Sequence, residues 1–383
     1  MELSVRGILQ RYFHAYAQRH GVPRFRRDAA YALATCKTAA RGAHVRRCPA
    51  GHVEGIWYNS CRHRSCPQCG LLDATRWLHS RLRSLLPCAH HHLVFTLPSD
   101  LDELWRFNTK LLTELLFETV QWCLTRMLED PRYLGAKPGV LAVLHTWGRT
   151  LALHPHLHCL VTAGGVDDRG QWRSPARSIL VPCRPLGELF RGRFLNRLER
   201  LIRRGKLALP PDRTTVDALF ILTRAAGKKW TPRVEHRYEH GDGVVHYLAR
   251  YVRGGPFRNS SLVACRDDRV TFRYGNWRHR DDRGRPSPDL LTLDVDDFLS
   301  RLLIHVPQRH TRTVRGWGLY AHNQQRLLKA ARAQLPPTEA TASITPAPRA
   351  WISSLCCPTC KQRLHVFRIP FSGRAPPTAP LPQ

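Results

Sequence analysis

The stretch from His154 to Thr162, HPHLHCLVT, decides the fold. Its apolar run predicts a β-strand over His156–Thr162. Because alternate side chains of a strand share a face, His156 and His158 point one way while Leu157 points into the core. Two imidazoles on one face can hold a divalent cation with open coordination positions, and such an ion can polarise a phosphodiester.

The His-x-His motif is weak evidence by itself. The chain has 21 histidines in 383 residues, so such a pair arises readily by chance, and the run His90–His92 competes with it. A third ligand has two candidates. His154 shares the face of the pair if the strand begins before Pro155, and His145 lies in another expected strand, over 139–147. The sequence leaves this choice open.

Further elements surround this stretch. Hydrophobic periodicity predicts both helices and strands, the order of an α+β layer fold. The other expected strands are 92–97 and a hairpin of 262–265 and 270–274; the expected helices lie within 1–35 and over 71–86, 101–128, 186–207 and 244–252.

The charge of the chain indicates a polyphosphate partner. Lys and Arg number 60 against 29 Asp and Glu, a formal net charge of +31 spread along the whole length. Nucleic acid is the obvious counter-ion, although a composition bias toward arginine is an alternative source of the charge. No apolar run is long enough for a membrane helix and no signal peptide opens the chain, so we expect a cytoplasmic protein, associated with the nucleoid when bound to DNA.

Five of the 13 cysteines lie between Cys36 and Cys69. Reduced thiols clustered in this way predict a zinc site rather than disulfides, with ordinary buried thiols as the alternative. The zinc would replace a core in a short basic segment, where Arg62 and Arg64 could reach phosphates. The sequence leaves open whether these ligands hold one zinc ion or two. The candidate ligands are Cys36, His44, Cys48, His52, Cys61, Cys66 and Cys69, and Cys357 with Cys360 forms a further half zinc knuckle or a pair of free thiols.

Tyr247 and Tyr251 are four residues apart, in the expected helix over 244–252. They would lie on one helix face and could reach one phosphate. A phenol has a pKa near ~10, so it needs help from a metal or from cations such as Arg250 and Arg253. Two core aromatics are the alternative, and Tyr12 with Tyr16 has the same spacing.

The order of these motifs resembles the rolling-circle insertion-sequence transposases of the IS91 class, over roughly residues 30 to 335. The matching blocks are YNSC (58–61), CPQC (66–69), HLVFTLP (92–98), LHTWG (144–148), HPHLHC (154–159), FRG (190–192), YLARY (247–251), VTFRY (270–274) and GLY (318–320). The family usually has a second cysteine two residues past the one that matches Cys48, but here the run is CPAGH (48–52), so either His52 substitutes for it or the site is altered. Ser65 stands in place of a frequent histidine. Both departures leave the zinc ligand set open.

The resemblance implies an HUH-type endonuclease core, an antiparallel sheet with flanking helices, after a small zinc-binding domain. His156 and His158 would hold Mg²⁺ or Mn²⁺. Tyr247 and Tyr251 would match the family's two nucleophiles, which cut single-stranded DNA at element ends, form a 5′-phosphotyrosine link and join it to a target. Host helicase and replication proteins would supply strand separation, since the chain has no phosphate-binding Gly-rich loop.

We expect four regions on this basis: a basic helical and zinc-binding domain over 1–87, the nuclease core over 88–305, a carboxyl-terminal helix within 306–335, and a linker and disordered tail over 336–383 with the half knuckle at 356–360. Two alternatives to the transposase stay open. One is a non-catalytic, zinc-stabilised DNA-binding relic, and the other is a plasmid replication initiator or relaxase.

Overall fold

The computed structural model describes residues 3–175, 180–239, 245, 246, 248, 255–281, 284–336 and 356–369. The chain forms two compact units, each built from separate segments. The first unit combines residues 1–75, 253–306 and 340–383, and the second combines 76–252 and 307–339. None of the helices in the described ranges is long and apolar enough to cross a membrane.

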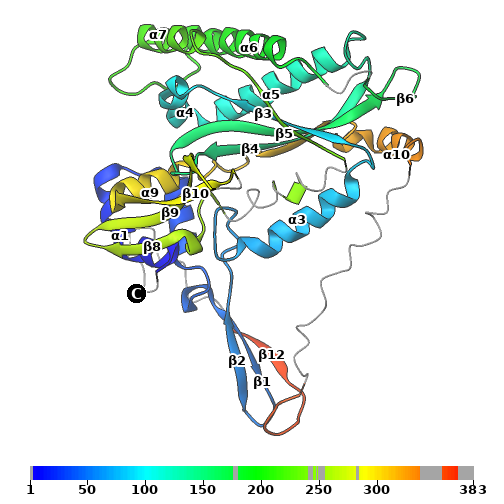
Figure 1. Cartoon of the computed structure of the whole chain (residues 1–383). Helices are drawn as coiled ribbons and strands as arrows, with labels where there is room; N and C mark the ends of the chain where they lie inside the picture. The colour runs from blue at the N-terminus through cyan, green and yellow to red at the C-terminus, as the bar shows by residue number, and fades with distance from the viewer. Residues whose placement is uncertain are drawn as a thin grey trace. The chain divides into compact units, whose positions relative to one another are not determined.

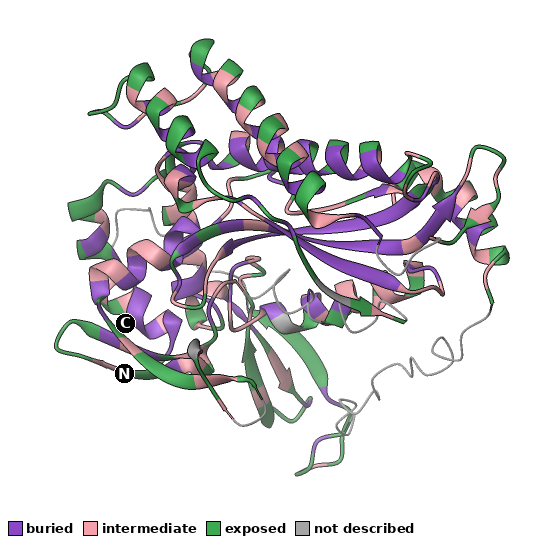
Figure 2. Ribbon diagram, turned by 45° about the horizontal axis from the view of Figure 1, so that its top comes forward, coloured by how far each residue is buried: buried purple, intermediate pink, exposed green. Residues whose placement is uncertain are grey.

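The second unit is built on one antiparallel sheet in the order β11-β4-β5-β3-β7, with β6 added beside β5 (Figure 1). Its central strand, β5, is apolar along most of its length and is largely buried, as Figure 2 shows. A strand buried on both faces requires a helical layer on each side. The strands are β3 (His90–Thr96), β4 (Lys137–Trp147), β5 (Leu153–Val166), β6 (Trp172–Arg173), β7 (Arg233–Tyr238) and β11 (Val314–Gly318).

Helices cover both faces of this sheet. On one face, Phe190 of α6 packs against Phe95 of β3 with ring centroids 5.3 Å apart. On the other face, Leu141, Val143 and Leu160 form a buried cluster with side chains of α3. The helices are α3 (Gly70–Ser84), which begins in the first unit, and α4 (Asp102–Phe107), α5 (Thr109–Leu128), α6 (Cys183–Arg203), α7 (Thr215–Ala226) and α10 (Gln325–Ala333).

The first unit contains a helical part and two small sheets. Phe257, Phe272 and Phe298 pack edge to face or tilted, with centroids 5.2 to 6.0 Å apart, and form part of its core. One sheet has the order β10-β9-β8 and the other the order β12-β1-β2. The elements are α1 (Val5–His20), α2 (Arg24–Ala34), α9 (Val295–Ile304), β1 (Ala43–Arg47), β2 (Val53–Tyr58), β8 (Leu262–Arg266), β9 (Arg269–Arg280), β10 (Pro286–Asp294) and β12 (His365–Ile369).

The α+β class is confirmed, as are the antiparallel sheet with flanking helices and the amino-terminal cysteine cluster. The hairpin of β8 and β9 turns at Asp267 and Asp268, whose φ angles are 50° and 53°. The single helix expected over 101–128 is instead two helices that meet at Asn108. The Asn108 side chain bonds Leu104 and both backbone groups of Ala208, so a distant loop stabilises the break.

Candidate functional site

Three histidines meet on one face of the large sheet. His145 comes from β4, and His156 and His158 come from β5, where the register places His145 opposite His156. One ring nitrogen of each lies within 4.8 Å of the others. His145 and His158 are buried and His156 is partly buried. The alternation predicted for His156 and His158 is therefore present, and the third member of the group is His145.

Hydrogen bonds select the nitrogen that each β5 histidine can offer to a metal. His156 Nδ1 lies 2.6 Å from the carbonyl oxygen of His154, so Nδ1 carries the proton and donates it. His158 Nδ1 lies 2.8 Å from Nε2 of His92. In both rings Nδ1 is therefore engaged, and Nε2 is the atom suited to ligation. Such outer partners fix the tautomer and orientation of metal-binding histidines.

Burial keeps these imidazoles neutral. It lowers the pKa of His156 to about 4 and lowers the pKa values of His145 and His158 well below the ordinary value. Neutral imidazole is the form that binds a metal ion. The group has the donor set and the protonation state of a transition-metal site.

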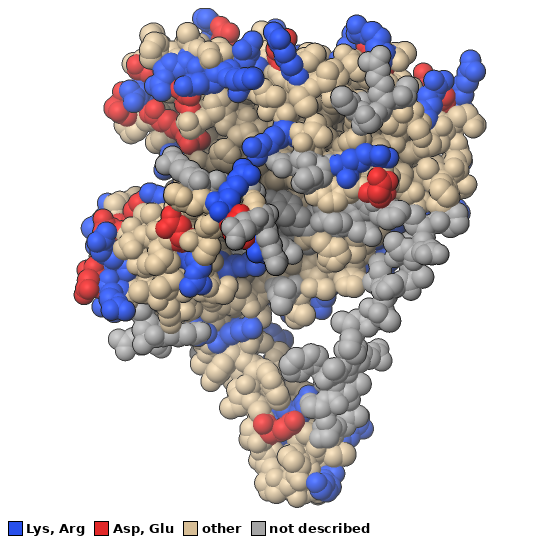
Figure 3. All heavy atoms as spheres, in the orientation of Figure 1, with Lys and Arg blue, Asp and Glu red and all other residues tan. Residues whose placement is uncertain are grey.

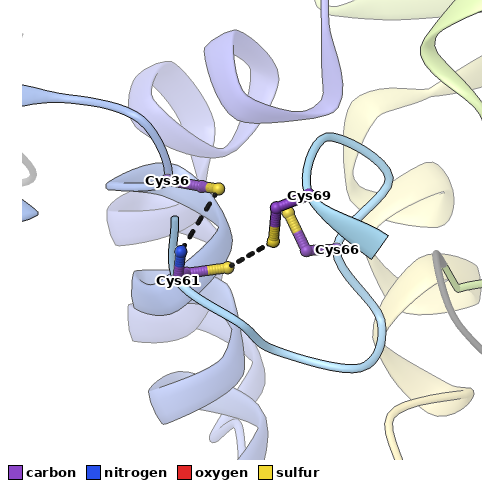
Figure 4. A group of neighbouring side chains, drawn as sticks. All are labelled: Cys36, Cys61, Cys66 and Cys69. Carbon is purple, nitrogen blue, oxygen red and sulfur yellow. Dashed lines mark hydrogen bonds between the residues drawn. The ribbon is translucent and has the colours of Figure 1, made fainter. Parts of the chain in front are cut away.

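Cys36, Cys61, Cys66 and Cys69 form a group of four thiols in the first unit (Figure 4). Cys36 follows α2, and Cys69 immediately precedes α3. The Sγ atoms of Cys61 and Cys69 are 3.6 Å apart, and the Cys61 amide donates to Cys36 Sγ at 3.5 Å. Hydrogen bonds among these thiols lower the pKa of Cys36, with Cys61 as the first contributor, and raise the pKa of Cys61 and Cys66, so within the group the Cys36 thiolate is favoured.

The remaining candidate ligands separate from this group. Cys48 and His52 lie beside Cys357 and Cys360, and their ligand atoms are again within 4.8 Å of one another. His44 belongs to no such group among the described residues. The structure therefore divides the candidates between two clusters, a division that the spacing in the sequence left open.

The chain matches two known sequence families. Residues 139–327 match a family described as "Putative transposase", and residues 8–97 match one described as "Transposase zinc-binding domain". It is 33% identical to "Putative transposase y4qJ" of Sinorhizobium fredii over 375 residues, which cover 94% of this chain and 93% of that protein. The chain belongs to the IS91 transposase family.

The chain is also similar to a second transposase and to one solved structure. The transposase is 28% identical over 296 residues to "Transposase for insertion sequence element IS801" of Pseudomonas savastanoi pv. phaseolicola, covering 76% of this chain and 69% of that one. A solved structure of the conjugative relaxase TrwC in complex with oriT DNA aligns with 60% of this chain and 93% of its own at 10% identity. Its TM-score is 0.23.

The predicted nucleophiles of the transposase, Tyr247 and Tyr251, lie outside the described residues, as do Arg250 and Arg253. Their described neighbours Val245 and Leu248 have helical backbone and are fully buried. Both belong to the cluster of Leu141, Val143 and Leu160.

That cluster lies on the histidine face of the sheet. Val143 and Leu160 are each two residues along their strands from His145 and His158, and residues two apart in a strand share a face. The chain segment that carries the tyrosines therefore packs, through its described residues, on the face that holds the triad.

The candidate site of the transposase includes His92, which was not predicted from the sequence. His92 belongs to the run treated as a competitor of the His-x-His motif, yet it bonds His158 directly. The signal available was the alternation in β3, which places His92 on the same face once β3 and β5 pair. Of the arginines expected to contact DNA, Arg62 is exposed and Arg64 is partly buried.

Proposed function

We propose that this transposase cuts and rejoins single-stranded DNA through a tyrosine nucleophile, with a divalent cation held by His145, His156 and His158. The observation that carries the proposal is the buried triad, whose two β5 members offer Nε2, in a chain of a transposase family. The triad resembles the metal site of HUH endonucleases.

The residues present fit a metal ion. Three neutral imidazoles within 4.8 Å supply three ligands and leave positions for phosphate oxygens. Mn²⁺ accepts nitrogen ligands more readily than the harder Mg²⁺, so the donor set favours Mn²⁺ of the two. When bound, the ion would polarise the scissile phosphate and neutralise its developing charge.

In the proposed reaction, Tyr247 or Tyr251 attacks the phosphorus at an element end. A bond forms between the phenolic oxygen and phosphorus as the phenol gives up its proton. The bond from phosphorus to the 3′ oxygen breaks, and the released 3′ oxygen takes up a proton. The product is a 5′-phosphotyrosine link and a free 3′-hydroxyl. Because the link keeps the phosphodiester's energy, joining to a target needs no nucleotide. The positions of Val245 and Leu248 support this role for the segment.

We propose zinc for the group of Cys36, Cys61, Cys66 and Cys69, in a closed site that stabilises the amino-terminal domain. Arg62, which follows Cys61 and is exposed, is proposed to contact phosphate, as are Arg64, Arg250 and Arg253. Lys and Arg side chains are spread over the face drawn in Figure 3, in accord with the net charge of +31. The proposed partners are single-stranded DNA at the element ends and target, and host helicase and replication proteins; the proposed location is the cytoplasm, at the nucleoid when DNA is bound.

A denaturing gel tests the nuclease. Purified protein is incubated with Mn²⁺ and labelled single-stranded oligonucleotides that copy both flanks of its gene. We expect a slowly migrating covalent adduct, which is lost in the double variant Tyr247→Phe with Tyr251→Phe and in His156→Ala. The single tyrosine variants rank the two nucleophiles.

Matched controls are Tyr133→Phe and His322→Ala, which change the same residue types outside the triad and the 245–252 segment and should leave the adduct intact. DNA binding without an adduct on either strand would overturn the nuclease and leave a DNA-binding relic. An adduct that requires a plasmid origin sequence rather than the gene's flanks would indicate a replication initiator or relaxase.

A further inference from the structure

We infer that Cys48, His52, Cys357 and Cys360 form a second zinc site, separate from the site at Cys36, that fastens residues 356–369 to the hairpin of β1 and β2. The four ligand atoms lie within 4.8 Å of one another. Neither matched family range extends to the two carboxyl-terminal cysteines, which are more than 300 positions from their partners.

The contacts within the group cross between the two segments. Cys48 Sγ lies 3.4 Å from Nδ1 of His52 and 3.4 Å from Sγ of Cys360. Cys357 Sγ lies 3.8 Å from the same nitrogen of His52. Each half therefore contributes two ligands that face the other half. Cys48 and Cys357 are each 2% exposed and Cys360 is partly buried, whereas His52 is exposed.

Backbone turns hold each pair of ligands in place. In the first segment, the Cys48 amide donates to His52 O at 3.1 Å and the Gly51 amide donates to Cys48 O at 2.9 Å. Gly51 has a φ of 89°, which a residue with a side chain rarely adopts. In the second segment, the Cys357 amide donates to Gln362 O at 2.8 Å and the Lys361 amide donates to Cys357 O at 2.9 Å. These turns hold both pairs of ligands in place within their own segments.

The strand that follows the second turn continues the attachment. β12 pairs with β1 along its whole length, from Arg47 opposite His365 to Ala43 opposite Ile369 (Figure 1). The guanidinium of Arg47 lies 4.3 Å from the ring centroid of Phe367.

This small sheet buries little apolar surface, since Ile56, Trp57 and Phe367 are each more than 40% exposed. A small sheet with little buried apolar surface needs a cross-link, and a structural metal is one that small domains use.

The donor set identifies the ion. Three thiolates and one imidazole make a closed tetrahedral set, the pattern of structural zinc, with no position left for substrate. The second zinc site and the pairing of β12 with β1 together make residues 356–369 part of the amino-terminal domain.

Zinc content of the full chain tests this inference. Purified wild type is compared by elemental analysis with Cys357→Ser and Cys360→Ser. We expect each variant to lose one zinc ion per chain relative to wild type, while the Cys36 site keeps its own. Cys356→Ser is the matched control, because Cys356 is adjacent, exposed and outside the group, and its zinc content should equal that of wild type. Equal zinc in wild type and in the Cys357 and Cys360 variants would overturn the second site.

A second measurement covers the case in which serine variants fail to fold. His52→Cys replaces the imidazole by a fourth thiolate and should keep the ion. After substitution with Co²⁺, this variant should show stronger thiolate-to-metal charge transfer than wild type, and His52→Ala should not. An unchanged Co²⁺ spectrum in His52→Cys contradicts the proposed ligand.

A proteolysis experiment tests whether the zinc site holds residues 356–369 on the β1–β2 hairpin. A specific protease site inserted between residues 340 and 350 allows the chain to be cut. With zinc present the released carboxyl-terminal fragment should stay bound to the rest of the chain, and Cys357→Ser or a chelator should release it. Release with zinc present and all four ligands intact would also overturn the inference.

Discussion

At the scale of single residues, we expect His92 to position the proposed metal ligand His158. Its Nε2 lies 2.8 Å from His158 Nδ1. When His158 offers Nε2 to a metal, Nδ1 carries the proton and His92 accepts the hydrogen bond. His92→Leu removes the acceptor, and we expect Mn²⁺ affinity to fall about 10- to 100-fold. His92→Gln restores an acceptor oxygen and should recover most of the affinity. Calorimetric titration with Mn²⁺ measures both, and equal affinity in His92→Leu and wild type would contradict the positioning role.

The triad also makes the metal-free protein sensitive to acid. An unfolded histidine binds a proton near pH ~6.5, whereas burial lowers the pKa of folded His156 to about 4. Between these values the unfolded chain holds more protons, so the free energy of unfolding decreases as the pH falls. For His156 alone the shift corresponds to about 3 kcal/mol. Thermal unfolding of apo-protein between pH 6.5 and 4 should show this decline, and a shallower one in His156→Phe.

Some of these site residues could be predicted from the sequence and others could not. The face shared by His156 and His158 follows from the two-residue period of a strand, which is local information. The choice of His145 over His154 required the register of β4 against β5, and the pairing of Cys48 with Cys360 required contacts across 312 positions. The spacing of residues along the sequence predicts neither the strand register nor the contact between the two cysteines.

At the scale of elements, the end of β11 meets the start of β4, the strand that carries His145. Gly318 has a φ of 59°, and a Cβ there would overlap the carbonyl of Pro138. Gly170 has a φ of 77°, but a Cβ there would meet open space, so it is a matched control. Gly170→Ala should cost about 1 kcal/mol of unfolding free energy from strain alone. Gly318→Ala should cost about 2 kcal/mol more.

Thermal or denaturant unfolding compares the two variants. Equal losses would show that backbone strain, and not the close approach of β11 to β4, accounts for the effect.

Most elements were predictable because their hydrophobic periods are strong. Strands β3, β4 and β5 and helix α6 coincide with the expected segments within a few residues. The break at Asn108 was not predicted, because the bonds that stabilise it come from Ala208, one hundred positions away.

At the scale of the whole molecule, the net charge of +31 predicts a steep dependence of DNA binding on salt. If about six phosphates are neutralised, the affinity for single-stranded DNA should follow salt with a logarithmic slope of about −4, a loss of roughly 300-fold between 50 and 200 mM. Fluorescence polarisation with a labelled oligonucleotide measures it. Arg62→Ala should reduce the slope by about 0.7. A slope near zero would indicate that the charge does not contact the DNA backbone.

The division into compact units could not be foreseen from the order of motifs. Sequence reasoning treats neighbouring segments as one domain, but the first unit gathers residues from three distant parts of the chain. The four regions expected along the sequence stay a prediction.

This discontinuity bears on how the polypeptide is made. As translation proceeds, α1, α2 and β1 leave the ribosome long before the segments that complete their unit, residues 253–306 and β12. Until then one edge of β1 has no strand beside it. A premature stop codon between the two units' segments would release a product whose amino-terminal unit is unfinished. Proteases that remove such products would leave only chains that were translated to the end.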